Sequence, residues 1–206
     1  MILTSPLLSQ LDWVEHGFGT RHAPTDQAGM ASLKQIHSKI SLVADRHTGC
    51  IGEGDALITR EPGVAVSVRT ADCFPILLAD PRTRAVAAVH AGWRGTVDRV
   101  VVEALNRMRT EYGSNPSELW AAIGPGIGKC CYEVGTEVAR RFGLEQAGHI
   151  DLAVENRRQL VAAGVPELHI DVQGLCTFCD PGKFFSWRRD HEKAGRMISY
   201  IRATAP

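Results

Sequence analysis

The sequence predicts an α+β fold in a single domain over residues 1–206, built as a large mixed β-sheet with flanking helices. Apolar strand-like segments cluster along the chain without regular alternation with helical segments, which argues against a doubly wound fold. Glycine and proline are spread as turn residues, and no repeat or low-complexity linker divides the chain. With 206 residues, of which 44% are hydrophobic, the chain can bury one substantial core.

The clearest local prediction is a β-hairpin in the first half of the chain. Strand-like runs cover residues 64–68, 74–79 and 84–90, and the turn Asp80-Pro81-Arg82-Thr83 joins the last two. Antiparallel pairing of these two runs places Cys73 and His90 near the same open end of the hairpin. We therefore treat this thiol and this imidazole as partners.

Helices are predicted where apolar residues recur at helical spacing. The first covers residues 97–108 with Thr96 as its N-cap, and others cover residues 134–142 and 151–163, the last ending at Gly164. Further strands are predicted over residues 119–123, 167–172, 184–188 and 196–202. The last three strands follow one another without an intervening helix, which is typical of an α+β protein.

Three side chains that bind soft metals stand out. Cys73 and His90 each lie at the end of an apolar strand, and His37 lies in another alternating apolar stretch that can run beside them. Zinc held by three protein ligands keeps a fourth position for water or substrate, whereas a structural zinc site closes with four. The thiol and an imidazole can also form a nucleophile and base pair. The residues indicate a catalytic site and leave these two chemistries open.

The glycine-rich turn after His90 is a candidate anion site. The segment Gly92-Trp93-Arg94-Gly95 leads directly into the predicted helix, so free backbone N–H groups and Arg94 can hold an anion beside the metal. A surface ion pair is the alternative for Arg94. Asp72 is interpreted as a strand-end cap, with a hydrogen bond to a metal-bound histidine as its alternative.

The remaining cysteines give a weaker signal. Cys176 and Cys179 have the spacing of a zinc ribbon, but Cys130 and Cys131 are adjacent and form no second pair of that spacing. Packed thiols are therefore the favoured interpretation. The chain has six cysteines, which are too few for a disulfide scaffold in a protein of this size.

Charge and composition disfavour several classes of function. Lysine plus arginine and aspartate plus glutamate number 23 each, so the formal net charge is zero and nucleic-acid binding is disfavoured. The N-terminus lacks a secretory signal pattern, and no apolar run reaches membrane-spanning length. We expect a cytoplasmic protein with a small-molecule substrate and no nucleic-acid or membrane partner, and the monomer is favoured although the sequence does not fix the oligomeric state.

A series of motifs runs through nearly the whole chain in order. They are His16-Gly17-Phe18-Gly19-Thr20-Arg21, Gln35-Ile36-His37, Gly54-Asp55-Ala56-Leu57, Thr70-Ala71-Asp72-Cys73, Val89-His90-Ala91-Gly92-Trp93-Arg94-Gly95-Thr96, Ile123-Gly124-Pro125-Gly126-Ile127, Cys131-Tyr132-Glu133-Val134, Cys176-Thr177 and Phe185-Ser186-Trp187-Arg188-Arg189-Asp190. In these motifs the chain resembles the laccase-domain or polyphenol-oxidase-like proteins, a family also described as multifunctional purine nucleoside phosphorylases and as peptidoglycan editing factors.

The resemblance implies a zinc site of His37, Cys73 and His90 and a layered α+β sandwich like that of toxin-type cysteine deamidases. It also implies phosphorolysis of adenosine, inosine and methylthioadenosine, together with hydrolytic deamination of adenosine. The three ligands are then the candidate catalytic residues, and Arg94 and Arg21 are the candidates for binding substrate or phosphate. Family members usually have a longer segment before the Gln-Val-His motif, whereas only 15 residues separate Arg21 from His37 here. For Asp55, another family-marked position, stabilisation of a loop or sheet edge is the default interpretation.

Two other functions stay open. With Cys73 as nucleophile and His90 as base, the protein would be a cysteine-type amidase or peptidase that edits peptidoglycan precursors. Copper at the same three ligands would make it a polyphenol oxidase. The chain has only eight histidines and no His-x-His pair, which does not suit a multicopper cluster.

Overall fold

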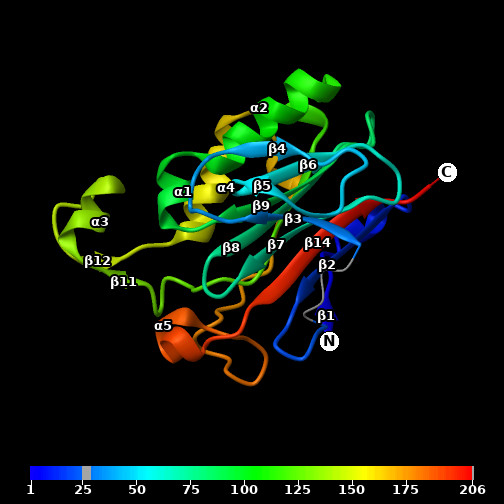
Figure 1. Cartoon of the computed structure of the whole chain (residues 1–206). Helices are drawn as coiled ribbons and strands as arrows, with labels where there is room; N and C mark the ends of the chain where they lie inside the picture. Colours follow the sequence, from blue (N-terminus) through cyan, green and yellow to red (C-terminus); the bar gives the residue numbers. More distant parts are fainter. Residues whose placement is uncertain (25–28, 206) are drawn as a thin grey trace.

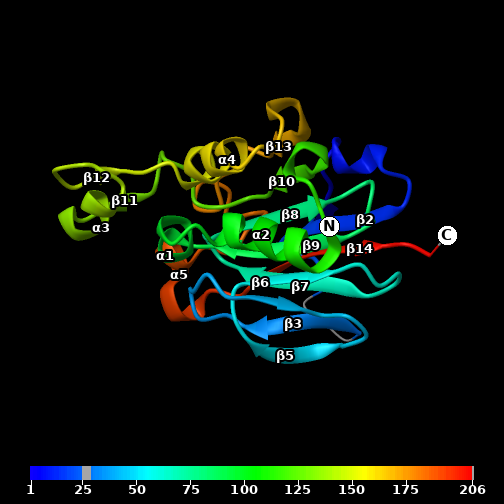
Figure 2. The same cartoon turned by 90° about the horizontal axis from the view of Figure 1, so that it is seen from above.

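The computed structural model describes residues 1–24 and 29–205, which form two stacked six-stranded β-sheets with helices covering the outer face of one sheet (Figures 1 and 2). The first sheet has the spatial order β1 (Ile2–Leu3), β2 (Val14–Gly19), β14 (Met197–Ala203), β7 (Ala65–Thr70), β3 (Met30–Lys34) and β5 (Gly49–Glu53). The second has the order β13 (Ile170–Val172), β10 (Trp120–Ile123), β8 (Phe74–Ala79), β9 (Val86–Ala91), β6 (Ala56–Thr59) and β4 (Ser41–Val43).

The helices and minor elements complete the described chain. The α-helices are α1 (Trp93–Val97), α2 (Val100–Tyr112), α3 (Thr136–Arg141), α4 (Leu152–Ala162) and α5 (Trp187–Asp190). A small two-stranded sheet pairs β11 (Glu133–Val134) with β12 (Gly148–His149), and short 3₁₀ helices are η1 (Leu8–Gln10), η2 (Pro116–Glu118), η3 (Glu167–His169) and η4 (His191–Lys193). Among the described residues, no helix is both long and apolar enough to cross a membrane.

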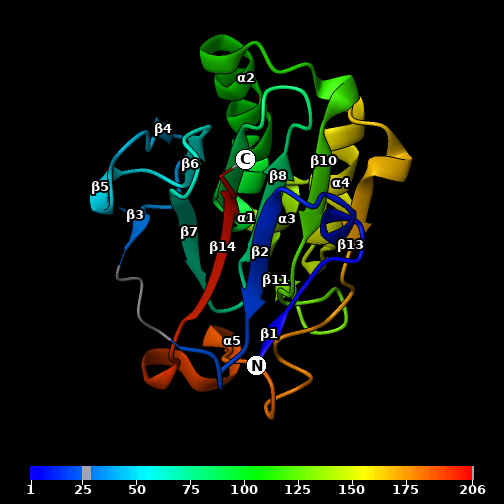
Figure 3. The same cartoon turned by 90° about the vertical axis from the view of Figure 1, so that its right-hand side faces the viewer.

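Strand directions are mixed in both sheets, which confirms the predicted α+β class. In the first sheet, β3 runs parallel to β5 and β7, and in the second, β10 runs parallel to β13 and β4 to β6. The other pairs are antiparallel. The strands form two stacked sheets rather than the one large sheet expected from the sequence, and Figure 3 shows β2, β14 and β7 side by side in front of the second sheet.

The core has two layers, one on each side of β8 and β9. Leu77 and Ala88 belong to the cluster between the sheets, which includes Val66. Their neighbours Ile76 and Val89 point the other way and belong to the cluster beneath α2 and α4. Because these strands are buried on both faces, they have continuous apolar sequences instead of alternating ones.

The helix predicted over residues 97–108 is divided into α1 and α2. Arg99 adopts the left-handed conformation with φ 62°, which ends one helix and lets the next begin. The predicted N-cap role of Thr96 is therefore wrong, since Thr96 lies within α1 and its buried hydroxyl accepts a 3.0 Å hydrogen bond from Asn156 of α4. The apolar spacing continues through the break, so periodicity alone does not reveal it.

Other boundaries also differ from the prediction. Residues 184–188 are not a strand, because Ser186 accepts a hydrogen bond from the Arg189 amide and caps α5. In residues 167–172 only the last three are extended, and in residues 134–142 the helix begins at Thr136. The helix at residues 151–163 is confirmed, with Asp151 as its N-cap. Residues 25–28, within the shortened segment between Arg21 and His37, lie outside the described residues.

Candidate metal centre

The hairpin of β8 and β9 is formed as predicted and brings Cys73 beside His90. Its register pairs Pro75 with His90, so Cys73, directly before β8, lies at the same end as His90. His37 is not in a strand, as the sequence analysis had it, but in the loop between β3 and β4 with φ 59°. The ligand atoms of the three side chains all lie within 4.8 Å of one another, with 4.0 Å between Cys73 Sγ and His37 Nε2.

The buried carboxylate of Asp55 organises this cluster. Its Oδ1 accepts a 2.8 Å hydrogen bond from His90 Nδ1 and a 3.1 Å bond from the His37 amide. Its Oδ2 accepts from the amide and hydroxyl of Ser38 at 2.5 and 2.7 Å. Since Asp55 engages Nδ1, the Nε2 atom of His90 is the one left to face a ligand. This position of Asp55 goes beyond the loop or sheet-edge stabilisation predicted from the sequence.

The role of Asp55 was not predicted, because its local sequence does not show which distant residue it faces. It comes immediately before β6, which pairs with β9, and its own carbonyl accepts a 2.7 Å hydrogen bond from the His90 amide. Its place is therefore set by sheet pairing between segments far apart in the chain. The signal that could have found it is the Gly54-Asp55 motif at the start of a buried strand.

The described partners of the Asp72 carboxylate are hydroxyl and amide groups and not a histidine, so its position agrees better with the predicted cap at a strand end. Its carboxylate accepts hydrogen bonds from the Thr177 hydroxyl at 2.7 Å, the Ser186 hydroxyl at 3.1 Å and the Arg188 amide at 2.6 Å. Asp72 thus anchors the C-terminal segment to the turn that carries Cys73.

Gly92 leaves the space that the cluster needs. A Cβ atom at this position would lie 2.9 Å from Cys73 Sγ and 3.1 Å from His37 Cδ2. Both distances are shorter than ordinary van der Waals contact, so any larger residue would displace one of these side chains. The glycine after β9 is therefore required by the cluster beside it.

The ionisation of Cys73 and His90 is coupled. Burial opposes the thiolate, but the charge of His90 and hydrogen bonds to both histidines outweigh it and lower the pKa of Cys73 to about 6. Burial also opposes charging of His90, yet Cys73 and Asp55 raise the pKa of His90 to about 9. A thiolate at neutral pH can be a metal ligand or a nucleophile.

The three side chains lie in the wall of a cavity of about 810 Å³ that several cationic side chains also line. They are Lys34, Arg69, Arg94, Arg188 and Arg196. Guanidinium groups suit the bidentate binding of phosphate oxygens. Arg94 is thus placed where the sequence analysis expected an anion-binding residue. Arg21 is not part of this lining, since its guanidinium donates to the Pro181 carbonyl and lies 4.9 Å over the Phe185 ring.

Aromatic rings form the other notable part of the lining. Trp93, Tyr132 and Trp187 all border the cavity. Each is paired with a lining arginine, and the guanidinium to ring distances are 4.3, 5.3 and 5.4 Å respectively. Flat, partly polar surfaces of this kind suit a heteroaromatic ligand that also carries negative charge.

The donor set fits a zinc ion with an open coordination position. Two imidazoles and one thiolate are three of the ligands that zinc prefers, and Asp55 supplies the outer hydrogen bond that metal-bound histidines usually make. His90 is buried while His37 is exposed, so the cluster is reached from the cavity side.

The profile of the family described as multi-copper polyphenol oxidoreductase laccase matches residues 19–204. The chain belongs to this laccase-like family. The resemblance expected from the motifs is therefore confirmed.

The fold agrees with that of solved structures. This laccase-like chain superposes on the crystal structure of YlmD from Geobacillus stearothermophilus with a TM-score of 0.88 at 27% identity, covering 98% of this chain and 94% of that one. The hypothetical protein YfiH from Bacillus licheniformis gives the same TM-score and identity, with coverage of 95% and 94%.

Several laccase-like relatives carry enzyme names. Proteins named purine nucleoside phosphorylase from Bacteroides thetaiotaomicron and Deinococcus radiodurans are 43% and 42% identical over 161 and 181 residues. These alignments cover 71% and 83% of this chain but only 60% and 69% of the relatives. A protein named adenosine deaminase RL5, from an unknown prokaryotic organism, is 38% identical over 175 residues, covering 78% of this chain and 66% of that protein.

Proposed function

We propose that the protein is a zinc-dependent purine nucleoside phosphorylase that acts on adenosine, inosine and methylthioadenosine and also deaminates adenosine. The observation that carries the proposal is the cluster of His37, Cys73 and His90 in the wall of a cavity lined by arginines. The names of the relatives support the same class of reaction.

Phosphorolysis needs a site for a phosphate dianion next to the sugar. An oxygen of hydrogen phosphate forms a bond to ribose C1′ while the bond from C1′ to the purine nitrogen breaks, and the proton of the phosphate ends on the purine. Arg94 and Arg188 lie in the same cavity as the cluster and would hold and orient the phosphate by charge-assisted hydrogen bonds. Trp93 and Tyr132 would support the purine.

A metal ion held by the three-residue cluster would add positive charge at one side of the cavity. Zinc bound by His37, Cys73 and His90 would supply a positive charge toward an oxygen atom of phosphate or of water. Asp55 would keep the His90 ring in the orientation that leaves Nε2 facing the ion. Deamination of adenosine would use the same cavity with water in place of phosphate.

The cavity draws on most of the chain, which supports our proposal that residues 1–206 act as one catalytic domain. Its lining begins at Leu33 in β3 and ends at Arg196 just before β14. Both sheets and the loops at one end of them therefore contribute to a single site. A piece that began after Leu33 or ended before Arg196 would lose part of the wall.

The direct test combines metal analysis with a nucleoside assay. We expect the purified protein to release hypoxanthine from inosine only when phosphate is present, and to convert adenosine to inosine without phosphate. Cys73→Ala and His37→Ala should each lose the zinc of this site and at least 100-fold in turnover. Cys50→Ser is the matched control, because Cys50 is exposed and lies outside both metal-ligand clusters of the described chain.

The same experiment separates the alternative functions. A Cys73→Ala protein that keeps wild-type zinc and phosphorolysis would refute the proposal. A covalent adduct of a cell-wall peptide on Cys73, with no nucleoside turnover, would instead support a cysteine-type amidase. Oxygen uptake with a phenol, dependent on added copper and lost in His37→Ala, would identify the polyphenol oxidase.

A further inference from the structure

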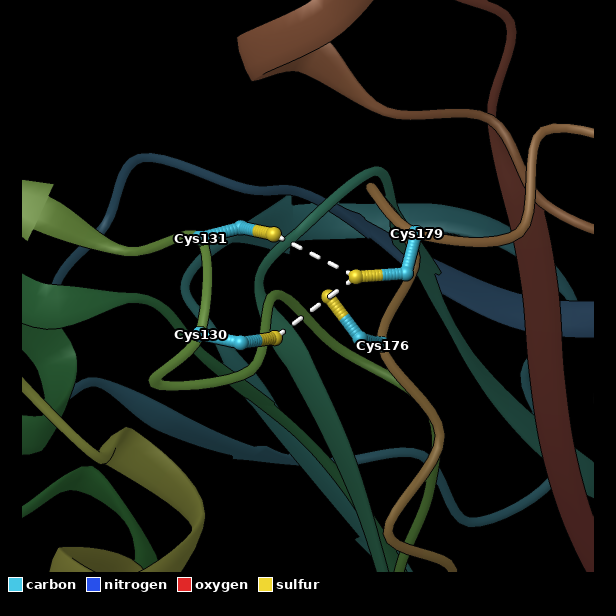
Figure 4. Close-up of side chains that lie close together, drawn as sticks. All are labelled: Cys130, Cys131, Cys176 and Cys179. Carbon is cyan, nitrogen blue, oxygen red and sulfur yellow. Dashed lines mark hydrogen bonds between the residues drawn. The ribbon is translucent and has the colours of Figure 1, made fainter.

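Four cysteines meet at a second place in the molecule (Figure 4). Cys130 and Cys131 come from the loop between β10 and β11, and Cys176 and Cys179 come from the segment between β13 and α5. Their sulfur atoms all lie within 4.8 Å of one another, and all four are free thiols. Cysteine spacing along the chain favours packed thiols and does not predict this cluster. The adjacent pair and the spaced pair nevertheless face each other in space.

The sulfur positions fit a tetrahedral ion. A zinc to sulfur bond of about 2.3 Å places neighbouring sulfurs of a tetrahedron about 3.8 Å apart. Cys179 Sγ lies 3.6 Å from Cys130 Sγ and 3.3 Å from Cys131 Sγ. These separations are close to the tetrahedral edge, and a small outward movement of the side chains would accommodate an ion at the centre.

The backbone supports negatively charged sulfur at one of the four cysteines, Cys176. The amide of Gly128 donates a 3.2 Å hydrogen bond to Cys176 Sγ, which favours the thiolate form. The amide of Cys131 bonds back to the Gly128 carbonyl at 2.9 Å and folds the loop around the cluster. A Cβ atom on Gly128 would lie 3.3 Å from both Cys130 Sγ and Cys176 Cβ, so glycine leaves the sulfurs room.

We propose that Cys130, Cys131, Cys176 and Cys179 bind a structural zinc ion, separate from the ion at the His37 cluster. Four thiolates close the coordination shell, so no position remains for substrate and the ion would act on the fold alone. Binding replaces the protons of the thiols with one divalent cation.

The position of the cluster explains what such an ion would stabilise. It joins two loops that already lie side by side at the isolated bridge between Gly126 and Cys176. Thr177 lies between the two C-terminal ligands and donates its buried hydroxyl to Asp72. Tyr132 directly follows Cys131 and lines the cavity. The ion would therefore hold the cavity wall and the segment that anchors the Cys73 turn.

The test counts zinc in variants that remove one cluster at a time. We expect wild-type protein purified under reducing conditions to hold two zinc ions per chain, and His37→Ala to hold one. In the His37→Ala protein, X-ray absorption should show four sulfur neighbours at about 2.3 Å. The double variant Cys176→Ser/Cys179→Ser should lose this ion, and Cys50→Ser should keep both.

Two further measurements keep the proposal testable if the double variant does not fold. A mercurial thiol reagent titrated into folded His37→Ala protein should release one equivalent of zinc as the cluster thiols react. Peptide mapping under native redox conditions should show all four cysteines reduced. A His37→Ala protein that contains no zinc, that contains iron, or that has a Cys131 to Cys179 disulfide would overturn the proposal. None of these outcomes depends on nucleoside turnover, so failure of the proposed enzyme activity would be distinguishable.

Discussion

Replacing Asp55 by asparagine tests whether the buried carboxylate prepares His90 to bind a metal. The variant keeps the size of the side chain but turns one oxygen into an amide NH₂ group. In the native protein, Oδ1 accepts from His90 Nδ1 and the His37 amide, and Oδ2 accepts from Ser38. Whichever way the new amide turns, its NH₂ group faces at least one backbone N–H donor, so at least one hydrogen bond is lost.

The expected losses of zinc affinity and of stability in Asp55→Asn follow from two separate magnitudes. A hydrogen bond to a charged group contributes about 1.5–3 kcal/mol. Loss of an outer partner of a metal-bound histidine lowers metal affinity about 10–100-fold, which corresponds to about 1.4–2.7 kcal/mol. These ranges overlap, so we expect Asp55→Asn to bind zinc about 30-fold more weakly. Its free energy of unfolding in the absence of metal should also fall by about 2 kcal/mol.

The assay is inosine phosphorolysis across a series of zinc-buffered solutions in which the cysteine cluster stays filled, so that turnover reports the occupancy of the His37 cluster. Asp80→Asn is the matched control, because Asp80 is also fully buried but bonds the Arg82 and Thr83 amides and the Thr83 hydroxyl at the other end of β8. It should lose stability without a change in zinc dependence. Equal zinc dependence of Asp55→Asn and wild type, or an equal weakening in Asp80→Asn, would refute the reasoning.

Three more predictions concern other positions. Gly92→Ala should lose the active-site zinc because its Cβ would lie 2.9 Å from Cys73 Sγ, whereas Gly135→Ala, with nothing within 4 Å, should retain it on elemental analysis. Arg94→Ala should raise the KM for phosphate at least 10-fold, because it removes one charge-assisted contact of about 1.5–3 kcal/mol, and Arg94→Lys should recover part of the loss; an unchanged KM in Arg94→Ala would contradict the phosphate role. Burial alone would raise the pKa of Asp80, but hydrogen bonds with Ser114 and with Thr83 and Arg82 of its own turn hold the pKa below its ordinary value of 3.8. The unfolded chain therefore takes up this proton first, so the free energy of unfolding should fall as the pH drops below 3.8, and denaturant titrations should show a smaller fall in Asp80→Asn.

The part of the site that could be predicted from the sequence is the part fixed by local geometry. A four-residue turn between two apolar runs sets the hairpin register, and that register alone places Cys73 and His90 together. His37 was also identified, although its supposed strand is a loop held by bonds to Asp55. A metal-binding residue type was a sufficient signal there, even where the expected backbone was wrong.

What could not be predicted depends on contacts between distant segments. Asp55 faces His90 because β6 pairs with β9. Asp72 accepts hydrogen bonds from Thr177 and Arg188, which lie more than 100 residues further along the chain. The cysteine cluster is the clearest case, since Cys131 and Cys179 are 3.3 Å apart although their spacing matched no linear metal motif. Patterns along the chain report periodicity and turns, and they do not report which loops meet.

Hydrogen bonds at Asp72 connect the two metal-ligand clusters, and the ions at the two clusters would have different roles. The Ile127 amide donates a 2.8 Å hydrogen bond to the Asp72 carbonyl, and the Thr177 hydroxyl donates to the Asp72 carboxylate, so both cysteine-bearing loops meet at the residue before Cys73. An ion at the four cysteines would therefore fix the Cys73 turn, whereas an ion at the His37 cluster would be held by His37, Cys73 and His90, which lie outside both cysteine-bearing loops. Removal of the cysteine ion should thus weaken zinc binding at the His37 cluster, because the ligand turn loses its support. Binding linkage makes the free-energy coupling equal in both directions, so replacing His37 should weaken zinc binding at the four cysteines by the same free energy, and we expect this closed site to stay filled.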